Sequence, residues 1–263
     1  MSSSDTQEPR PGHLQASCKA GTGFALFFAP GSRPDQAAVL QLFETVEFTA
    51  LAAQPGHCPP ADEGWLEILA SGLTFDLTGL APTSVDAVPL AGQDYGFAPG
   101  KMPQGAFEAI MLVPSVHIAA GIALPPVFRS MASLAANLAE ALGAVAIGWE
   151  SAGTLIKPAF FARAVYNWLG GGAFPALGLT ALVPGGEGAV TTRGLTFFTG
   201  REASIERRVG ESDQALLKLS IRIIDYLVAE GAFTDPREVT IGEERVVIEP
   251  SRVGKQTWIW RSG

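Results

Sequence analysis

Three carboxylates occupy positions from which they could carry out acid–base chemistry. Glu202 and Glu206 follow a strand predicted over 190–199, and in an extended chain they lie on the same face. Glu150 comes directly after the apolar run 144–149, at a strand end, where functional groups are common. Two carboxylates on one face could share a proton transfer. The alternative, which we favour, is a solvated edge strand whose alternating charges prevent sheet-to-sheet aggregation.

The usual motifs of nucleophilic, phosphate and metal chemistry are absent from the sequence. It contains no G-x-S-x-G elbow, no G-x-x-x-x-G-K-[ST] loop and no complete dinucleotide fingerprint. His57 and Cys58 are neighbours, so their side chains point to opposite faces of an extended chain and form no nucleophile–base pair. His117 lies in an apolar segment, where a hydrogen-bonded core or interface histidine is expected. We therefore predict no catalytic residue, no metal site and no cofactor.

The charge balance bears on the kind of partner. Only 17% of the 263 residues are charged, and 26 acidic against 18 basic side chains give a net charge of −8. An acidic chain repels the phosphates of nucleic acids and lacks the basic patch that anionic membranes attract. A surface low in charge suits a face that a partner covers. We expect a protein partner, either a second copy or another chain, and no nucleic-acid or membrane partner.

The cysteines and the first residues indicate the compartment. Cys18 and Cys58 are too few for a disulfide framework and indicate a cytoplasmic protein with reduced thiols, although a bridge between them stays open. Asp5 and Glu8 stand where a signal peptide needs an apolar run, so none is expected. The polar segment 1–20 predicts a disordered tail.

One apolar stretch, Ala109 to Phe128, has the length of a membrane span and carries no formal charge. Three prolines interrupt it, and the pair Pro125-Pro126 is typical of a helix start. A buried strand, a loop and the beginning of a helix account for this pattern, so we predict no membrane span.

The apolar pattern divides the chain into two halves that a proline- and glycine-rich segment joins. After the tail we predict an N-terminal α+β half at 21–80, a loop or linker at 81–105 and a C-terminal α+β half at 106–263. In the first half a helix begins near Ser32, the expected cap, with Asp35 at the capping-box position. Strands are predicted at 23–29, 47–52, 65–70 and 73–78.

The second half also alternates strands with helices. Helices are predicted at 125–142, 158–169 and 213–230, where prolines or Ser212 begin them and glycines end them. Several strands are only a turn apart, and short connections require antiparallel pairing. The prediction is an α+β fold with a mainly antiparallel sheet, helices packed on one face, and two halves that could be related β-α-β units. The strands of the second half are predicted at 107–119, 144–149, 176–183, 190–199, 203–208, 239–249 and 257–260.

Two segments, AVAIGWESAGTLIKPAFF at 144–161 and TRGLTFFTGREASIE at 192–206, resemble an uncharacterised bacterial family known as a domain of unknown function. The resemblance covers roughly 107–260. It implies a strand, a proline-opened helix, a strand pair, an amphipathic helix and two closing strands, and it implies no catalytic residues. The positions that match the family pattern are Thr192, Gly194, Leu195, Phe198, Glu202 and Glu206.

Two functions follow as hypotheses. The first is a non-enzymatic cytoplasmic protein that acts through protein–protein contact, as an adaptor or an antitoxin-like binder, because no catalytic constellation is visible. The second is an enzyme or small-ligand binder whose site lies between the two halves, with 81–105 as its lid. Its candidate residues are Trp149, Glu150, Arg193 and Glu202.

Overall fold

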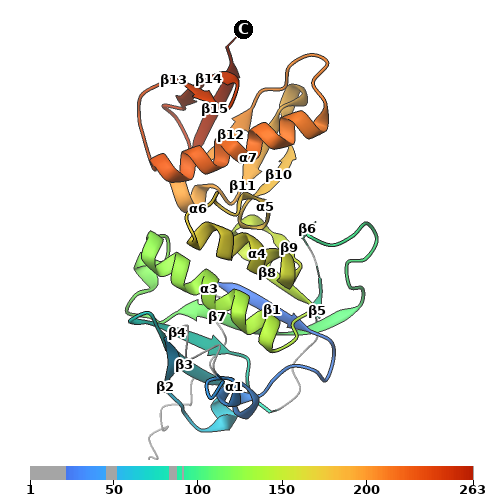
Figure 1. The fold of residues 1–263 in the computed structure, drawn as a ribbon, viewed down its shortest axis with the longest axis vertical. Helices are drawn as coiled ribbons and strands as arrows, with labels where there is room; N and C mark the ends of the chain where they lie inside the picture. The colour runs from blue at the N-terminus through green and yellow to red at the C-terminus, as the bar shows by residue number, and fades with distance from the viewer. Residues whose placement is uncertain (1–21, 46–51, 83–87, 91, 263) are drawn as a thin grey trace, which may run out of the picture.

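The structure, a computed structural model, describes residues 22–45, 52–82, 88–90 and 92–262, and their strands form two sheets (Figure 1). Sheet 1 is antiparallel except for the pair β6–β9. Its spatial order is β2 (Ala53–His57), β3 (Trp65–Ala70), β4 (Leu73–Thr78), β7 (Ala106–Pro114), β1 (Phe24–Phe28), β8 (Ala146–Trp149), β9 (Thr154–Ile156) and β6 (Gln93–Tyr95), with β5 (Val88–Pro89) beside β7.

The strand β1 lies in the middle of sheet 1, and its sequence explains why. Phe24, Leu26 and Phe28 alternate along FALFF and are completely buried, which is the period of a strand with one face on the core. Phe24 lies opposite Leu112 of β7 and opposite Trp149 of β8. The core of this half is therefore assembled from strands far apart in the sequence.

Two long helices cover one face of sheet 1. They are α3 (Pro125–Ala141) and α4 (Pro158–Leu169), which pack on each other, with α3 over β1, β4 and β7 and α4 against β8. Both begin with proline, whose missing N–H costs nothing in the first turn. A short helix, α1 (Gln36–Leu42), lies near β2 and β3 at the other end of the sheet (Figure 1). Its cap is Asp35, which accepts a hydrogen bond from the Ala38 N–H, and not Ser32 as predicted.

Sheet 2 has one face covered by a single helix, α7 (Asp213–Glu230), which crosses in front of it in Figure 1. The helix turns Leu216, Leu219, Ile223, Ile224 and Leu227 into the core. The strands β12 and β15 pair in parallel and the other pairs are antiparallel. The order is β10 (Ala181–Pro184), β11 (Val190–Arg193), β12 (Glu202–Ile205), β15 (Gln256–Arg261), β14 (Glu244–Pro250) and β13 (Arg237–Ile241).

These sheets and helices confirm the α+β prediction with mainly antiparallel pairing. Several boundaries differ. Residues 176–179 form a helical turn, α5 (Ala176–Leu179), instead of the start of a strand. The strand predicted over 190–199 ends at Arg193 and gives way to α6 (Thr196–Thr199). The strand predicted over 239–249 is a hairpin, because Gly242 takes a positive φ and turns the chain between β13 and β14.

The segment 81–105 does not separate the two sheets. The strands β4 and β7 on either side of it pair with each other, and its own residues 93–95 form β6 at the edge of sheet 1. Strands of both predicted halves therefore build sheet 1, whereas sheet 2 begins with β10. The predicted tail and most of the strand at 47–52 lie outside the described residues, and so does Cys18, while Cys58 is an exposed free thiol.

The stretch from Ala109 to Phe128 is the end of β7, a loop with one 3-10 turn and the start of α3, as the prolines predicted. Across the described part of the chain, every helix is too short or too polar to cross a bilayer.

Candidate functional site

The four residues predicted as a site lie where sheet 1 meets sheet 2. Trp149 ends β8 and Glu150 begins the 3-10 turn after it, while Arg193 ends β11 and Glu202 begins β12. The structure brings Arg193 and the turn after Trp149 together. Trp149, Arg193 and Glu202 pack against or hydrogen-bond to other parts of the chain.

Trp149 is the centre of an aromatic cluster. Its side chain is fully buried, and its ring centroid lies 4.9 Å from that of Phe24, 5.4 Å from Phe128 and 5.0 Å from Phe197. Phe24 and Phe128 come from the first sheet and its helix, whereas Phe197 comes from α6 of the second. Trp149 is thus a core residue that joins the two sheets, and the prediction that it faces a ligand does not hold for a ring without solvent access.

Arg193 fastens the end of β11 to the turn after β8. Its Nε donates to the carbonyl oxygen of Ala152 at 2.6 Å and its Nη2 to that of Gly153 at 3.1 Å. The chains approach so closely that a Cβ on Gly194 would lie 2.7 Å from the Cβ of Ala152. Arg193 is therefore a clamp between the sheets.

Glu150 is exposed, and within the described residues its carboxylate forms no ion pair or hydrogen bond.

The carboxylate of Glu202 is occupied by the chain around α6. Its Oε1 accepts from the N–H groups of Gly194 at 2.8 Å and Thr196 at 3.1 Å. Its Oε2 accepts from the Leu195 N–H at 3.2 Å and the Thr192 hydroxyl at 2.5 Å. A carboxylate that accepts from four donors organises the turn between β11 and α6.

We expect Glu202→Ala to lower the free energy of unfolding by about 2–3 kcal/mol, because three N–H groups and a hydroxyl lose their acceptor. The matched control is Glu206→Ala, four residues further along the chain, which removes one hydrogen bond, from the Arg261 N–H. It should cost about 1 kcal/mol or less. Urea unfolding measures both, and equal losses would contradict the structural role of Glu202.

Tyr95 makes a second connection between the sheets. The Leu182 N–H of β10 donates to its hydroxyl at 3.4 Å, and Gln93 Nε2 donates to the Leu182 carbonyl at 3.2 Å. Burial raises the pKa of Tyr95 above its ordinary value, and the bond from Leu182 opposes that shift to a smaller degree. The edge strand β6 therefore carries a neutral, partly buried phenol against the second sheet.

This raised pKa predicts a loss of stability in alkali. Above about pH 10 the unfolded chain has released the tyrosine proton while the folded chain still holds it, so the free energy of unfolding falls as the pH rises. The loss is complete once the pH passes the folded pKa. We expect Tyr95→Phe to show a shallower fall than the wild type in urea unfolding above pH 10, and parallel curves would contradict the assignment.

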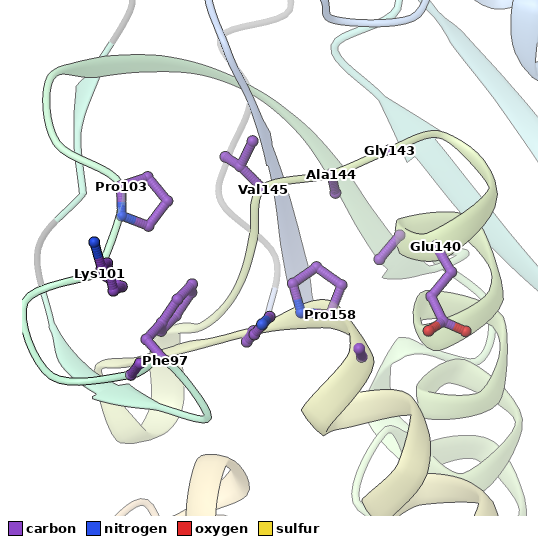
Figure 2. Close-up of a pocket in the computed structure, with 12 residues that line it drawn as sticks. Phe97, Lys101, Pro103, Glu140, Gly143, Ala144, Val145 and Pro158 are labelled. Atoms are coloured by element: carbon purple, nitrogen blue, oxygen red, sulfur yellow. The ribbon is translucent and has the colours of Figure 1, made fainter.

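A groove of about 630 Å³ lies beside sheet 1, and we call it the loop groove. Figure 2 shows Phe97, Lys101 and Pro103 of the 81–105 segment on one side and Glu140 at the end of α3 on the other. Pro158, at the start of α4, lies between them (Figure 2). None of the four predicted site residues borders this groove, so it is not the site between the two halves for which 81–105 is the predicted lid.

The backbone of the loop groove packs tightly against α4, whereas the charged side chains at the groove are exposed and unpaired within the described residues. Gly96 takes a positive φ, and a Cβ there would lie 2.4 Å from the Cβ of Phe160, so only glycine fits against α4. Lys101, Lys157 and Glu140 are exposed and form no ion pair within the described residues. The groove could hold a small molecule with separated charges, but its walls present no buried polar side chain to orient one.

Comparisons with protein-family models, curated proteins and solved structures gave no significant match. The resemblance to the domain of unknown function therefore stays a prediction.

The most unusual surface is the face of sheet 2 opposite α7, which we call the open face. Trp258 and Trp260 on β15 are 40% and 43% exposed, and their rings stack 5.9 Å apart at an interplanar angle of 17°. They border a groove of about 520 Å³, the tryptophan groove. Its other walls come from the β10–β11 turn and from β11, β12 and the start of β15: Gly186, Ala189, Thr191, Ser204, Glu206, Arg207, Gln256 and Ile259.

Sequence reasoning missed this groove although it predicted the strand at 257–260. In Thr257-Trp258-Ile259-Trp260 every second residue is tryptophan, so both rings had to share one face. The alternate positions are also partly apolar, and the pattern does not tell which face meets the core. Ile259 is 1% exposed and Thr257 5% exposed under α7, which leaves the tryptophans outside.

Proposed function

We propose that this protein is a cytoplasmic, adaptor-like or antitoxin-like binding protein that holds another protein on the open face of sheet 2. The observation that carries the proposal is the exposed pair Trp258 and Trp260 in the interior of a sheet. Tryptophan is the residue most enriched at the energetic centres of protein interfaces, because one ring offers a large apolar area together with an N–H donor.

The remainder of the open face supports the same use. Trp260 is held in place by Glu249, whose Oε2 accepts from the indole N–H at 2.8 Å. Arg245 and Glu238 form an exposed ion pair at 3.6 Å nearby on β13 and β14. A rigid aromatic centre with a polar rim is the usual anatomy of a protein-binding patch.

The test compares proteins that co-purify from the source cell with the tagged wild type and with Trp258→Ala/Trp260→Ala. Because the two rings are exposed, we expect the double variant to fold normally while losing at least one stoichiometric partner. The matched control is Val116→Ala/Leu124→Ala, which removes two side chains, 89% and 59% exposed, from the other half of the molecule. The proposal fails if the tryptophan variant and the control retain the same partners.

A further inference from the structure

The tryptophan groove contains polar groups that the protein itself does not use. Ser204 is only 8% exposed, it lines the groove, and its hydroxyl makes no hydrogen bond within the described chain. The side chains of Thr191 and Gln256 and the indole N–H of Trp258 also line the groove without a hydrogen bond to the described chain. The Ser204 oxygen is still open to the groove, so a ligand that displaces its water has to offer an acceptor in return.

These groups are arranged as a row across the sheet. Thr191 lies opposite Ser204, Ser204 lies opposite Trp258, and Trp258 lies opposite Glu249. Neighbouring strands are about 4.8 Å apart, so donors and an aromatic ring follow one another in a fixed order across the groove. Each of these side chains can donate a hydrogen bond except the carboxylate at the end.

We propose that the tryptophan groove binds a proline-rich segment of the partner in the polyproline II conformation, flanked by basic residues. Such a chain has no internal hydrogen bonds, so its carbonyls are free acceptors, and its prolines need no acceptor because they lack an N–H. It therefore matches a floor of unused donors beside exposed indole rings.

The rim of the groove indicates the flanking charge. Glu206 lines the groove, and Glu249 lies next to it as the acceptor of the Trp260 indole N–H. Arg207, the cation among the described residues of the wall, is paired with Asp213 at 2.7 Å and also donates to the carbonyl of Gly188. The rim is therefore acidic, as is the whole chain at −8, and it favours arginine or lysine beside the prolines.

The inference rests on the proposed function, and its test uses the full chain with a synthetic peptide of about ten prolines flanked by arginines, long enough for three turns of the helix. Titration calorimetry and tryptophan fluorescence measure binding. We expect saturable binding that Trp258→Ala weakens at least about 30-fold, as for an interface hot spot. Ser204→Ala should weaken it about threefold to tenfold, the value of one hydrogen bond, and Val116→Ala should leave it unchanged.

Controls separate this inference from the proposed function. An alanine-substituted peptide with the same arginines should not bind, because the proposal requires the prolines as well as the positive charge. Binding of this peptide would mean that charge alone accounts for the affinity. The inference is overturned if the proline peptide does not bind, if Trp258→Ala binds it as tightly as the wild type, if soluble oligosaccharides bind instead, or if light scattering shows a dimer that only the tryptophans hold. If the peptide fails while Trp258→Ala/Trp260→Ala still loses a cellular partner, the partner class is wrong and the proposed function stands.

Discussion

Replacing Trp149 with alanine should lower the free energy of unfolding by about 3–5 kcal/mol. The ring is fully buried between Phe24, Phe128 and Phe197, so its removal leaves a cavity where the two sheets meet. The loss comprises the transfer free energy of the ring and the contacts that its neighbours forfeit. Thermal and urea unfolding measure the effect.

Two further variants make this prediction specific. Trp149→Phe keeps an aromatic ring in the cluster and should cost about half as much as alanine. Trp258→Ala removes the same side chain from the open face and should cost about 1–2 kcal/mol, because solvent already reaches 40% of that residue. If Trp149→Ala were as mild as Trp258→Ala, the aromatic cluster would not be what joins the sheets.

Removing Arg261 should be comparably severe, at about 3–5 kcal/mol. Its side chain is 3% exposed and contacts Glu211 at 3.1 Å, itself 10% exposed, and Glu244 at 3.1 Å. Arg261→Ala leaves the Glu211 carboxylate out of water without a cation. The desolvation of that charge, more than the lost attraction, determines the size of the effect.

The decisive comparison is the double variant Arg261→Met/Glu211→Leu. Because it removes both buried charges, its free energy of unfolding should lie within about 1 kcal/mol of the wild type or above it. Glu244 keeps Arg208 as a partner at 3.0 Å. A surface control, Arg245→Ala, breaks an exposed pair and should cost about 0.5 kcal/mol or less. If the double variant lost as much free energy of unfolding as Arg261→Met and Glu211→Leu lose together as single variants, the two buried charges would not be coupled.

The helices could be predicted from the sequence because their ends are marked locally. Ser212 and Gly231 bound α7, and the predicted 213–230 is the observed range. The proline at 158 and the glycines from 170 likewise fix α4 at 158–169. These signals act over a few residues, so a single sequence contains them.

The arrangement of the sheets and the site could not be predicted, since both depend on residues far apart in the chain. The sequence offers Trp149 as a candidate, and only the fold brings Phe197 against it. Glu202 was a candidate because it is a carboxylate, and only the turn at 194–196 shows what it binds. Thr191, Ser204 and Trp258 lie side by side only because β11 pairs with β12 and β12 pairs with β15.

The place of β15 in sheet 2 has a consequence for synthesis on the ribosome. The strands β10, β11 and β12 form one block and the β13–β14 hairpin forms another, and β15 is the strand that pairs with both. Until residues 256–261 have left the ribosomal tunnel, β12 and β14 present unpaired edges and α7 has an incomplete surface to cover. Sheet 2 therefore closes late, and a nascent chain paused before β15 is a natural client for chaperones.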